Sequence, residues 1–437
     1  MKKYIFISVI LSVTVLIAMP YLVGVVAQKE TDAAVVSLNE KLDDNGYFEV
    51  VAYKRTYRAT ESTFKLSVAD FFETDVEIEF SCKGTHGLIS YKYDCLVDDS
   101  SENFQKTIDE HFDGKEFVTL DGEIILFGAL KQHLVIDSFN KSTDKRTVVF
   151  DGGEINFETT RDLNTLKVVA KLGSFKLSYE DNKTSFNSID VNGYFYDAGD
   201  TLDFGKIEIG VSDFNYFEKE LSTLSAAKLQ LDSSLNGRGD AVEFNFDLKV
   251  EQAFALDGDD KQHEVDNLSI AFKVREINRK ALVKLNKLIK TISTANEDPE
   301  DLAIGPMLTV FPTVESFLTQ GFGFSMSVDA TENSDRLFIA IDLNLNDKLS
   351  FLELSTVIYA PESILDQVNF TSDMILPDTF VDLDAEFAKY ITDSSFYEKT
   401  GDGYKSKFSI KDGNVNINGK RMSAEKFVEE VMSEATQ

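Results

Sequence analysis

The stretch Phe244-Asn-Phe-Asp-Leu-Lys-Val250 decides the fold of this chain, because apolar and polar side chains alternate through it without a break. A period of two places the apolar side chains on one face of a β-strand and the polar ones on the other. The segment Leu268 to Val274 repeats the pattern almost at once. The two segments therefore predict strands with one apolar face and one face in water.

The same alternation recurs over most of the 437 residues, interrupted by turn-forming residues such as Asp151-Gly152-Gly153. Helical spacing is confined to a few segments, which are Gln28–Asp44, a helix with its N-cap at Asn278, a helix from Pro299, Asp384–Thr392 and Ser423–Met432. The pattern predicts a mainly β (α+β) protein, with an extended curved or two-layer antiparallel sheet and a few covering helices.

The predicted strands carry more apolar surface than these helices can cover. The sheet must therefore curl on itself, stack in two layers or leave an apolar trough. A closed core and a trough that holds an acyl chain both remain open alternatives from the sequence. Since one hydrophobic core stops growing at about 250–300 residues, more than one region is expected. We expect a cytoplasmic tip and transmembrane anchor in residues 1–27 and a periplasmic β-rich region in residues 28–276. A helical insertion with a C-terminal β-rich region is expected in residues 277–437.

The chain opens with 23 uncharged, mostly apolar residues, Tyr4 to Val26, behind Lys2 and Lys3. As a helix this segment is long enough to cross a hydrocarbon core of about 30 Å. Val25-Val26-Ala27 has the small residue that a signal-peptide cleavage site needs, so cleavage remains an alternative. We expect an uncleaved, single-pass anchor, with the basic pair in the cytoplasm and the bulk of the chain outside it.

Charge and motifs exclude several functions. The net charge of −31 repels phosphate backbones, so nucleic acid is not an expected partner. The four histidines lack metal-ligand spacing, and the sequence has no nucleophile elbow, Walker loop or dinucleotide-binding glycine motif. We therefore expect a non-enzyme without cofactor or metal.

One stretch approaches a calcium-binding pattern. Residues from Asp342 to Glu353 place oxygen donors at five positions of a calcium loop, but Asp347 stands where the loop requires glycine. We interpret the stretch as two strands joined by an Asn346-Asp347 turn.

The two cysteines, Cys82 and Cys95, flank a turn signal at Gly84 to Gly87. In an oxidising compartment a hairpin there would allow a disulfide, which would stabilise the fold by roughly 3 kcal/mol. Two free thiols are the alternative. A zinc site is not expected, because His86 is the only histidine between them.

A basic cluster follows Asn278 within this acidic chain. Lys280, Lys284 and Lys287 share one face of the predicted helix. A solvated face and a site for a phosphate or lipid headgroup are both open interpretations.

Three stretches resemble the YdgA-like family, bacterial proteins anchored in the inner membrane with a periplasmic body of unassigned activity. Gly413 to Val428 is similar to the family's ending, in which a short strand, an N-G-x-x-M-S turn and a helix close the chain. Tyr57 to Phe64 is similar to the family's Arg-Gly-x-Phe-Ser motif, with Ala59 and Glu61 where glycine and an aromatic residue are usual.

The third stretch, His86-Gly87, resembles a His-Gly-Pro element, with Leu88 in place of proline, and Gly152-Gly153 fits a family strand opening. We interpret His86 as a turn residue. The resemblance implies the periplasm of a Gram-negative bacterium and a β-rich body, and it supplies no catalytic residues.

Our leading hypothesis is a non-enzymatic envelope protein that binds a lipid-like or apolar ligand on a curved sheet. The alternative is a periplasmic scaffold that docks another envelope protein through its sheet edges or its acidic face.

Overall fold

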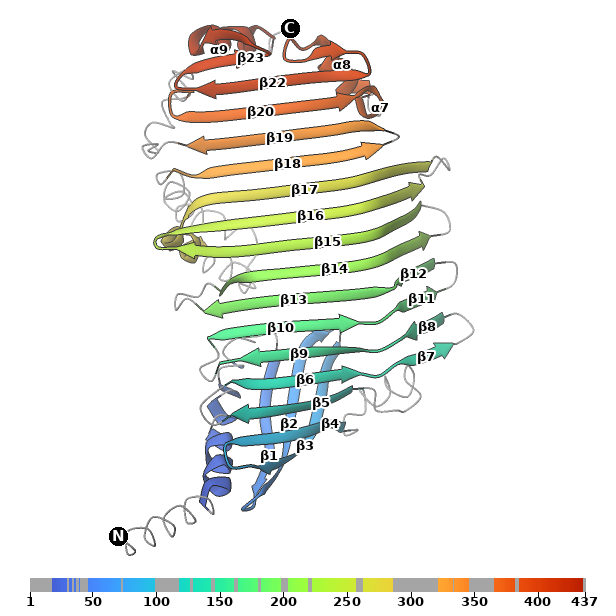
Figure 1. Ribbon diagram of the computed structural model, residues 1–437, viewed down its shortest axis with the longest axis vertical. Helices are drawn as coiled ribbons and strands as arrows, with labels where there is room; N and C mark the ends of the chain where they lie inside the picture. Colours follow the sequence, from blue (N-terminus) through green and yellow to red (C-terminus); the bar gives the residue numbers. More distant parts are fainter. Residues whose placement is uncertain are drawn as a thin grey trace, which may run out of the picture. The chain divides into compact units, whose positions relative to one another are not determined.

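The computed structural model describes residues 18–434 except 30, 34, 37–38, 40–45, 72–73, 99–117, 126–128, 143–145, 161–163, 180–181, 198–202, 219–221, 257–261, 286–320, 333, 346–364 and 382–384. The described chain is mainly β, as the alternation predicts, and its strands pair in antiparallel order (Figure 1). It divides into two compact units, residues 1–196 with 215–219 (unit 1) and residues 197–214 with 220–437 (unit 2).

Unit 1 contains a larger and a smaller ladder of antiparallel strands. The larger ladder runs, in spatial order, through β1 (Gly46–Arg55), β2 (Ala59–Phe71), β3 (Thr74–His86), β4 (Ser90–Asp98), β5 (Val118–Ile125), β6 (Leu130–Ile136), β9 (Gly153–Thr159), β10 (Thr165–Leu172) and β13 (Ser188–Asp197). The smaller ladder runs through β7 (Phe139–Ser142), β8 (Arg146–Phe150), β11 (Phe175–Tyr179) and β12 (Asn182–Phe186).

A crease separates the two ladders, because each strand of the smaller one continues a strand of the larger one after a short break (Figure 1). The breaks lie at residues 137–138, 151–152, 173–174 and 187. Gly152 adopts a φ of +88°, a conformation that costs glycine least. The amide of Gly173 donates to the carbonyl oxygen of Gly152 at 2.7 Å and joins two of the breaks. The predicted Asp-Gly-Gly turn is therefore a bend within a continuing strand.

Beyond the crease, four phenylalanines stand opposite one another on the smaller ladder. The register pairs Phe139 with Phe150, Phe150 with Phe175, and Phe175 with Phe186. Their successive ring centroids lie 5.5, 6.4 and 5.4 Å apart. Cross-strand aromatic pairs of this kind fix the register of short strands.

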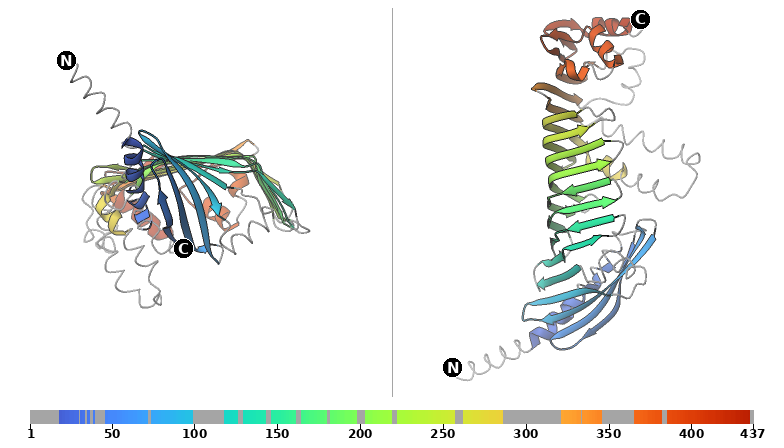
Figure 2. Two further views of the ribbon diagram at one scale, coloured as in Figure 1. Left: turned by 90° about the horizontal axis from the view of Figure 1, so that it is seen from below. Right: turned by 90° about the vertical axis from the view of Figure 1, so that its right-hand side faces the viewer.

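A helix at residues 18–29 packs against the strands of unit 1 (Figure 2). Val23 and Ala27 are buried against Tyr91 of β4. The helix thus begins before Gln28, where the sequence placed its start, and residues 31–33 and 35–36 are also helical. Farther on, Asn39 Oδ1 accepts a hydrogen bond from the Phe48 amide at 2.7 Å, and Asn39 Nδ2 donates one to the Phe48 carbonyl oxygen at 2.8 Å. These bonds satisfy polar backbone groups of the strand β1.

Unit 2 is an open sheet whose green strands form a single layer when viewed from the side (Figure 2). Its antiparallel order is β15 (Ser222–Arg238), β16 (Ala241–Leu256), β17 (Gln262–Asn278), β18 (Gly323–Glu332), β19 (Asp335–Leu345), β20 (Val368–Pro377), β22 (Gly403–Lys411), β23 (Asn414–Ile417) and β24 (Lys420–Ser423). The strand β14 (Asp203–Glu218) precedes it, and β21 (Glu398–Thr400) also pairs with β22.

The described helices of unit 2 are a segment at 279–285, α7 (Asp378–Val381), α8 (Ala385–Asp393) and α9 (Ala424–Glu434). The predicted N-cap is confirmed, since Asn278 Oδ1 accepts a hydrogen bond from the Ala281 amide at 3.0 Å. The helix predicted from Pro299 lies outside the described residues.

The C-terminal prediction of a short strand, a turn and a helix is confirmed. Two tight hairpins join β22, β23 and β24, and both central residues of each turn have positive φ: 50° and 70° at Asp412-Gly413, 50° and 86° at Asn418-Gly419. Such turns match the twist of paired strands and favour Asp-Gly and Asn-Gly. The last helix, α9, packs Phe427 and Val428 against the buried cluster of Ile410, Val415 and Ile417.

Candidate functional site

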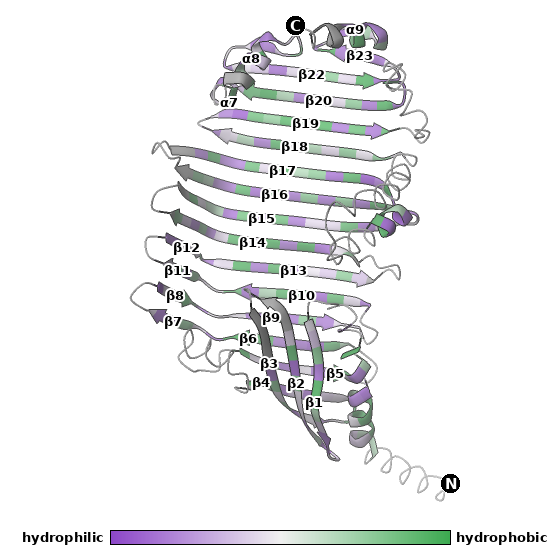
Figure 3. Cartoon of the chain, turned by 180° about the vertical axis from the view of Figure 1, so that it is seen from behind, coloured by the Kyte–Doolittle hydropathy of each residue, from purple (hydrophilic) through white to green (hydrophobic). Residues whose placement is uncertain are grey.

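One face of the unit 2 sheet carries three rows of side chains, apolar except for Ser372, that cross the strands at right angles. The register places the following residues side by side, here called the apolar face: Leu248, Ile270, Val328, Ile339 and Met374 in one row; Phe246, Phe272, Met326, Ile341, Ser372 and Phe408 in the next; Val274, Phe324, Leu343, Phe370 and Ile410 in the third. Figure 3 shows the resulting alternation of hydrophobic and hydrophilic residues along these strands.

Most of the apolar face is only partly buried. Phe246, Phe272, Met326 and Ile341 all keep some contact with solvent, although they lie in the middle of the sheet. Phe272 stacks edge-on against Phe244 and Phe324, with centroids 5.9 and 5.1 Å apart. Contiguous, partly exposed apolar surface of this kind indicates an interaction site.

Burial is complete mainly toward the C-terminal end of the face. There α7 and α8 bury Val381 and Ile391 with Leu376, and Leu337 and Ile339 of β19 pack against this cluster. The described helices α7, α8 and α9 thus pack on the strands from β19 onward.

The opposite face of the same strands is polar and contains a hollow of about 610 Å³. Ala271, Ser327 and Ala340 form part of its wall, and their small side chains account for the depression. Three pairs of charged groups surround it: Arg275 with Asp342 at 2.7 Å, Lys273 with Glu243 at 2.8 Å, and Lys407 with Asp373 at 3.1 Å. The hydrogen bond from Lys273 is the main cause of the lowered pKa of Glu243. Because most of the charges at its wall are paired within the protein, the hollow offers a ligand little charge, and the apolar face is the stronger candidate.

Unit 1 contains another candidate site, a buried histidine at the end of β3. His86 is 6% exposed, and its Nε2 lies 2.6 Å from the hydroxyl of Thr60, which is 2% exposed. Burial lowers the pKa of His86. The interpretation of His86 as a turn residue is wrong, because the hairpin turn follows it and the imidazole packs inside, against Tyr91 at 5.5 Å.

The family model for bacterial proteins of unknown function, DUF945, matches residues 1–327. The chain belongs to this family. The match ends within β18 of the DUF945 chain and does not reach Gly413 to Val428, on which the YdgA-like resemblance chiefly depends. Comparisons with curated proteins and with solved structures find no match.

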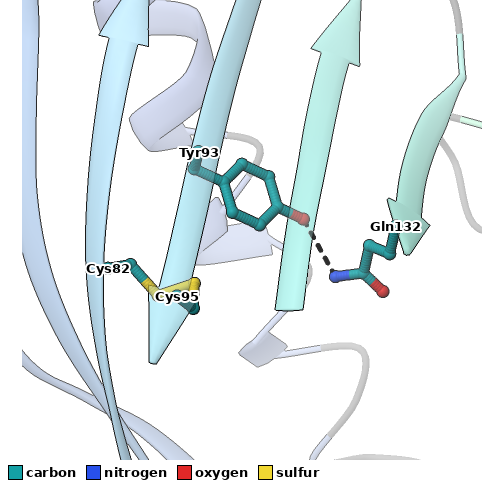
Figure 4. The surroundings of a disulfide bond; sticks show 4 residues. All are labelled: Cys82, Tyr93, Cys95 and Gln132. Atoms are coloured by element: carbon teal, nitrogen blue, oxygen red, sulfur yellow. Dashed lines mark hydrogen bonds between the residues drawn. A yellow bond between two sulfur atoms is a disulfide. The ribbon is translucent and has the colours of Figure 1, made fainter. Parts of the chain in front are cut away.

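The disulfide of this DUF945 protein is as predicted. Cys82 and Cys95 are direct partners in the register of β3 and β4, and their sulfurs are bonded (Figure 4). Beside them Tyr93 accepts a hydrogen bond from Gln132 at 3.0 Å. Burial raises the pKa of Tyr93 to about 12, and the bond from Gln132 opposes that rise.

The basic cluster is only partly within the described residues. Lys280 and Lys284 are exposed on the helix at 279–285, and Lys287 lies outside the described residues. Two neighbours are engaged elsewhere, since Arg279 stacks on Phe204 at 5.1 Å and Arg275 pairs with Asp342.

The first positions of the calcium-loop pattern form part of a strand. Asp342 and Asn344 lie in β19, and both accept hydrogen bonds from Arg275, at 2.7 and 3.0 Å. The Asn346-Asp347 turn lies outside the described residues. Within the part of the chain that the structure describes, His, Cys, Asp and Glu side chains form no group of three that would hold a metal ion.

Most of the predicted anchor, Tyr4 to Val26, lies before residue 18 and therefore outside the described residues. Among the described residues, no helix combines the length and the apolar character needed to cross a bilayer. The last part of the segment packs on protein, with Val23 only 2% exposed. The sequence contains one signal of this contact. Gly24 is the single glycine in a run of larger apolar residues, and a glycine allows another group to approach the helix backbone closely.

Proposed function

We propose that this chain is a non-enzymatic envelope protein that binds a lipid-like ligand on the apolar face of unit 2. The observation that carries the proposal is the partial exposure of the central rows around Phe246, Phe272 and Met326. Membership of a bacterial family of unknown function is compatible with this role, and the YdgA-like resemblance favours the periplasm, with Tyr4 to Val26 as inner-membrane anchor.

The dimensions of the face suit an acyl chain. The rows run from β16 to β22, across five inter-strand spacings of about 4.8 Å, which gives a length of about 24 Å. One leaflet of a bilayer has a hydrocarbon thickness of about 15 Å, half of the usual 30 Å. A fatty acyl chain laid across the strands would therefore contact aliphatic and aromatic side chains along its length, and each buried methylene would contribute about 0.8 kcal/mol.

We further propose that Lys280, Lys284 and Lys287 contact the headgroup of the same ligand. Lys280 and Lys284 are exposed at the end of β17, and β17 contributes Ile270, Phe272 and Val274 to the apolar face. Neutralising the three lysines together should weaken binding to anionic liposomes or lipopolysaccharide. Unchanged binding would remove the headgroup role and leave the acyl-chain role intact.

Native mass spectrometry of the detergent-extracted protein tests the main proposal. We expect a co-purifying lipid on the wild-type chain. Met326→Ser should reduce the lipid-bound fraction, because it removes an apolar side chain from the centre of the face. The matched control is Ser327→Asp. Ser327 is the next residue on the same strand, so its side chain lies on the opposite, polar face, and this variant should retain the lipid.

Two outcomes would contradict lipid binding. One is equal lipid retention by both variants, with their circular dichroism unchanged. The other is a stoichiometric protein partner in place of lipid, which would favour the scaffold alternative.

A further inference from the structure

Both ring nitrogens of His86 are engaged, and their partners define its protonation. Nδ1 lies 3.3 Å from the carbonyl oxygen of Tyr57, which can only accept, so Nδ1 carries the proton and donates it. Nε2 then accepts a hydrogen bond from the Thr60 hydroxyl at 2.6 Å. The neutral imidazole is therefore fully satisfied in its buried position. A second proton on Nε2 would force the Thr60 hydroxyl to accept instead of donate, and it would place a positive charge in this buried position.

The helix at residues 18–29 covers this imidazole. A Cβ added to Gly24 would lie 2.3 Å from His86 Cε1 and 2.5 Å from Nδ1, so the helix backbone rests directly on the ring. Val23 and Ala27, on either side of Gly24, are buried against the same sheet. Any movement of the ring or of its hydrogen-bond partners must therefore be transmitted to the helix.

We propose that His86 is a pH-sensitive latch, which holds the helix at residues 18–29 on unit 1 while the imidazole is neutral and releases it when the imidazole is protonated. Residues 18–26 are the last part of the apolar segment Tyr4 to Val26, so release would free that part from unit 1.

Among the described residues, the groups that act on His86 include no counter-charge that would favour its protonated form. The groups that act on it are the Arg55 guanidinium of β1 and the Tyr57 carbonyl, and Arg55 repels an imidazolium. The neighbouring strands contribute hydroxyl groups that are neutral at physiological pH, those of Thr60, Tyr53 and Tyr91. From the helix side, Gln28 accepts a hydrogen bond from Arg55 at 2.9 Å, and the Asp32 carboxylate acts on Tyr53.

The direction of the pH effect follows from the lowered pKa of His86, whose first cause is burial. The released state has an imidazole pKa near the ordinary value of about 6.5, so it binds protons more readily than the docked state. Docking is therefore strongest above about pH 6.5 and weakens as the pH falls, by up to about tenfold per pH unit until the docked-state pKa is reached.

Hydrogen exchange of the full-length chain, followed by mass spectrometry, tests the latch. After correction for intrinsic exchange rates, peptides from residues 18–29 should lose protection between pH 7.5 and pH 5.5. His86→Gln keeps a donor and an acceptor without a titrating group, so its helix should stay protected at both pH values. The control His133→Gln changes a partly exposed histidine that pairs with Asp121 at 3.0 Å, and it should behave as the wild type. In Gly24→Leu the added side chain would clash with the imidazole and displace the helix. This variant therefore shows how fast the released helix exchanges at pH 7.5.

Equal protection of the wild-type helix at pH 7.5 and 5.5 would overturn the proposal, whatever the variants do. Loss of protection at pH 5.5 that persists in a folded His86→Gln protein would overturn it as well, because another group would then be responsible. Folding of this variant is checked by the protection of β3 and β4, the strands that carry the disulfide.

Discussion

The backbone of Gly24 lies against the imidazole of His86, so closely that a Cβ at position 24 would come within 2.3 Å of the ring. A glycine in a helix interior costs about 1 kcal/mol relative to alanine. The contact explains why this helix contains one at residue 24, since only a residue without a side chain lets the helix approach the sheet.

Gly24→Ala is predicted to lower the free energy of unfolding by about 1–3 kcal/mol, because the added methyl group overpacks the contact with His86. Urea unfolding of the full chain measures the change. Helix propensity alone predicts the opposite sign, a gain of up to about 1 kcal/mol, so a more stable variant would contradict the packing argument. Leu22→Ala, on the same helix at 49% exposure, is the control and should change stability by less than about 0.5 kcal/mol.

Removal of the disulfide should destabilise unit 1. Cys82 and Cys95 are 13 residues apart, and a loop of this size restricts the unfolded chain by about 3 kcal/mol. The double change of both cysteines to alanine should shift the urea midpoint downward by a corresponding amount. Reductant should lower the midpoint of the wild type and leave that of the double variant unchanged. Alkylation of both thiols in the native, unreduced protein would show instead that the bond is absent.

Gly152→Ala should destabilise the crease. Its φ of +88° is strained for any residue with a Cβ, and that Cβ would lie 2.8 Å from the Ile136 carbonyl oxygen. We expect a loss of about 1–3 kcal/mol in thermal unfolding. The matched control is Gly210→Ala in β14, where, beyond its chain neighbours, no heavy atom of the described residues lies within 4 Å of the added Cβ. That change should be neutral or slightly stabilising, and equal losses in both variants would argue against a special role for Gly152.

Asp232→Asn should stabilise unit 2. Asp232 stands directly opposite Asp247 in the register of β15 and β16, and its Oδ1 is buried without a hydrogen-bond partner in the described residues. Like charges opposed in this way destabilise a strand pair by about 0.2–1 kcal/mol. We expect a higher melting temperature at pH 7. Glu251→Gln, which breaks an exposed pair with Lys228, is the control and should have little effect. A lower melting temperature for Asp232→Asn would mean that the carboxylate is needed.

Tyr93 should make stability fall at alkaline pH. Its pKa is raised to about 12 in the folded chain, above the ordinary value of 10.0, so the unfolded chain loses this proton first. Stability from Tyr93 is therefore complete below pH 10 and is lost as the pH rises from 10 to 12. In Tyr93→Phe the decline over this range should be shallower in urea unfolding, whereas the exposed Tyr194→Phe should keep the wild-type slope. Identical slopes in all three proteins would show that Tyr93 ionises alike in both states.

Local sequence patterns predicted the elements that depend on a few adjacent residues. The alternation from Phe244 to Val250 identified β16, and the Asn278 side chain identified the start of a helix, because both signals come from neighbours in the chain. The Cys82–Cys95 pairing was predictable for the same reason, since one hairpin brings the two residues together.

The contacts that define the candidate sites are not local. A period of two shows that Phe272 has an apolar face, but only strand pairing places it between Phe246 and Met326. Whether that face is covered depends on the whole sheet. The burial of His86 under Gly24 joins segments 62 residues apart.

The sequence by itself determined that this protein is β-rich and acidic, and it predicted the hairpin disulfide. Only the tertiary structure decided that the sheet of unit 2 is open, that unit 1 is creased at Gly152, and that the N-terminal helix rests on a buried histidine. The physical reason is that alternation and turn chemistry act between neighbouring residues, whereas strand order and burial depend on which distant segments meet.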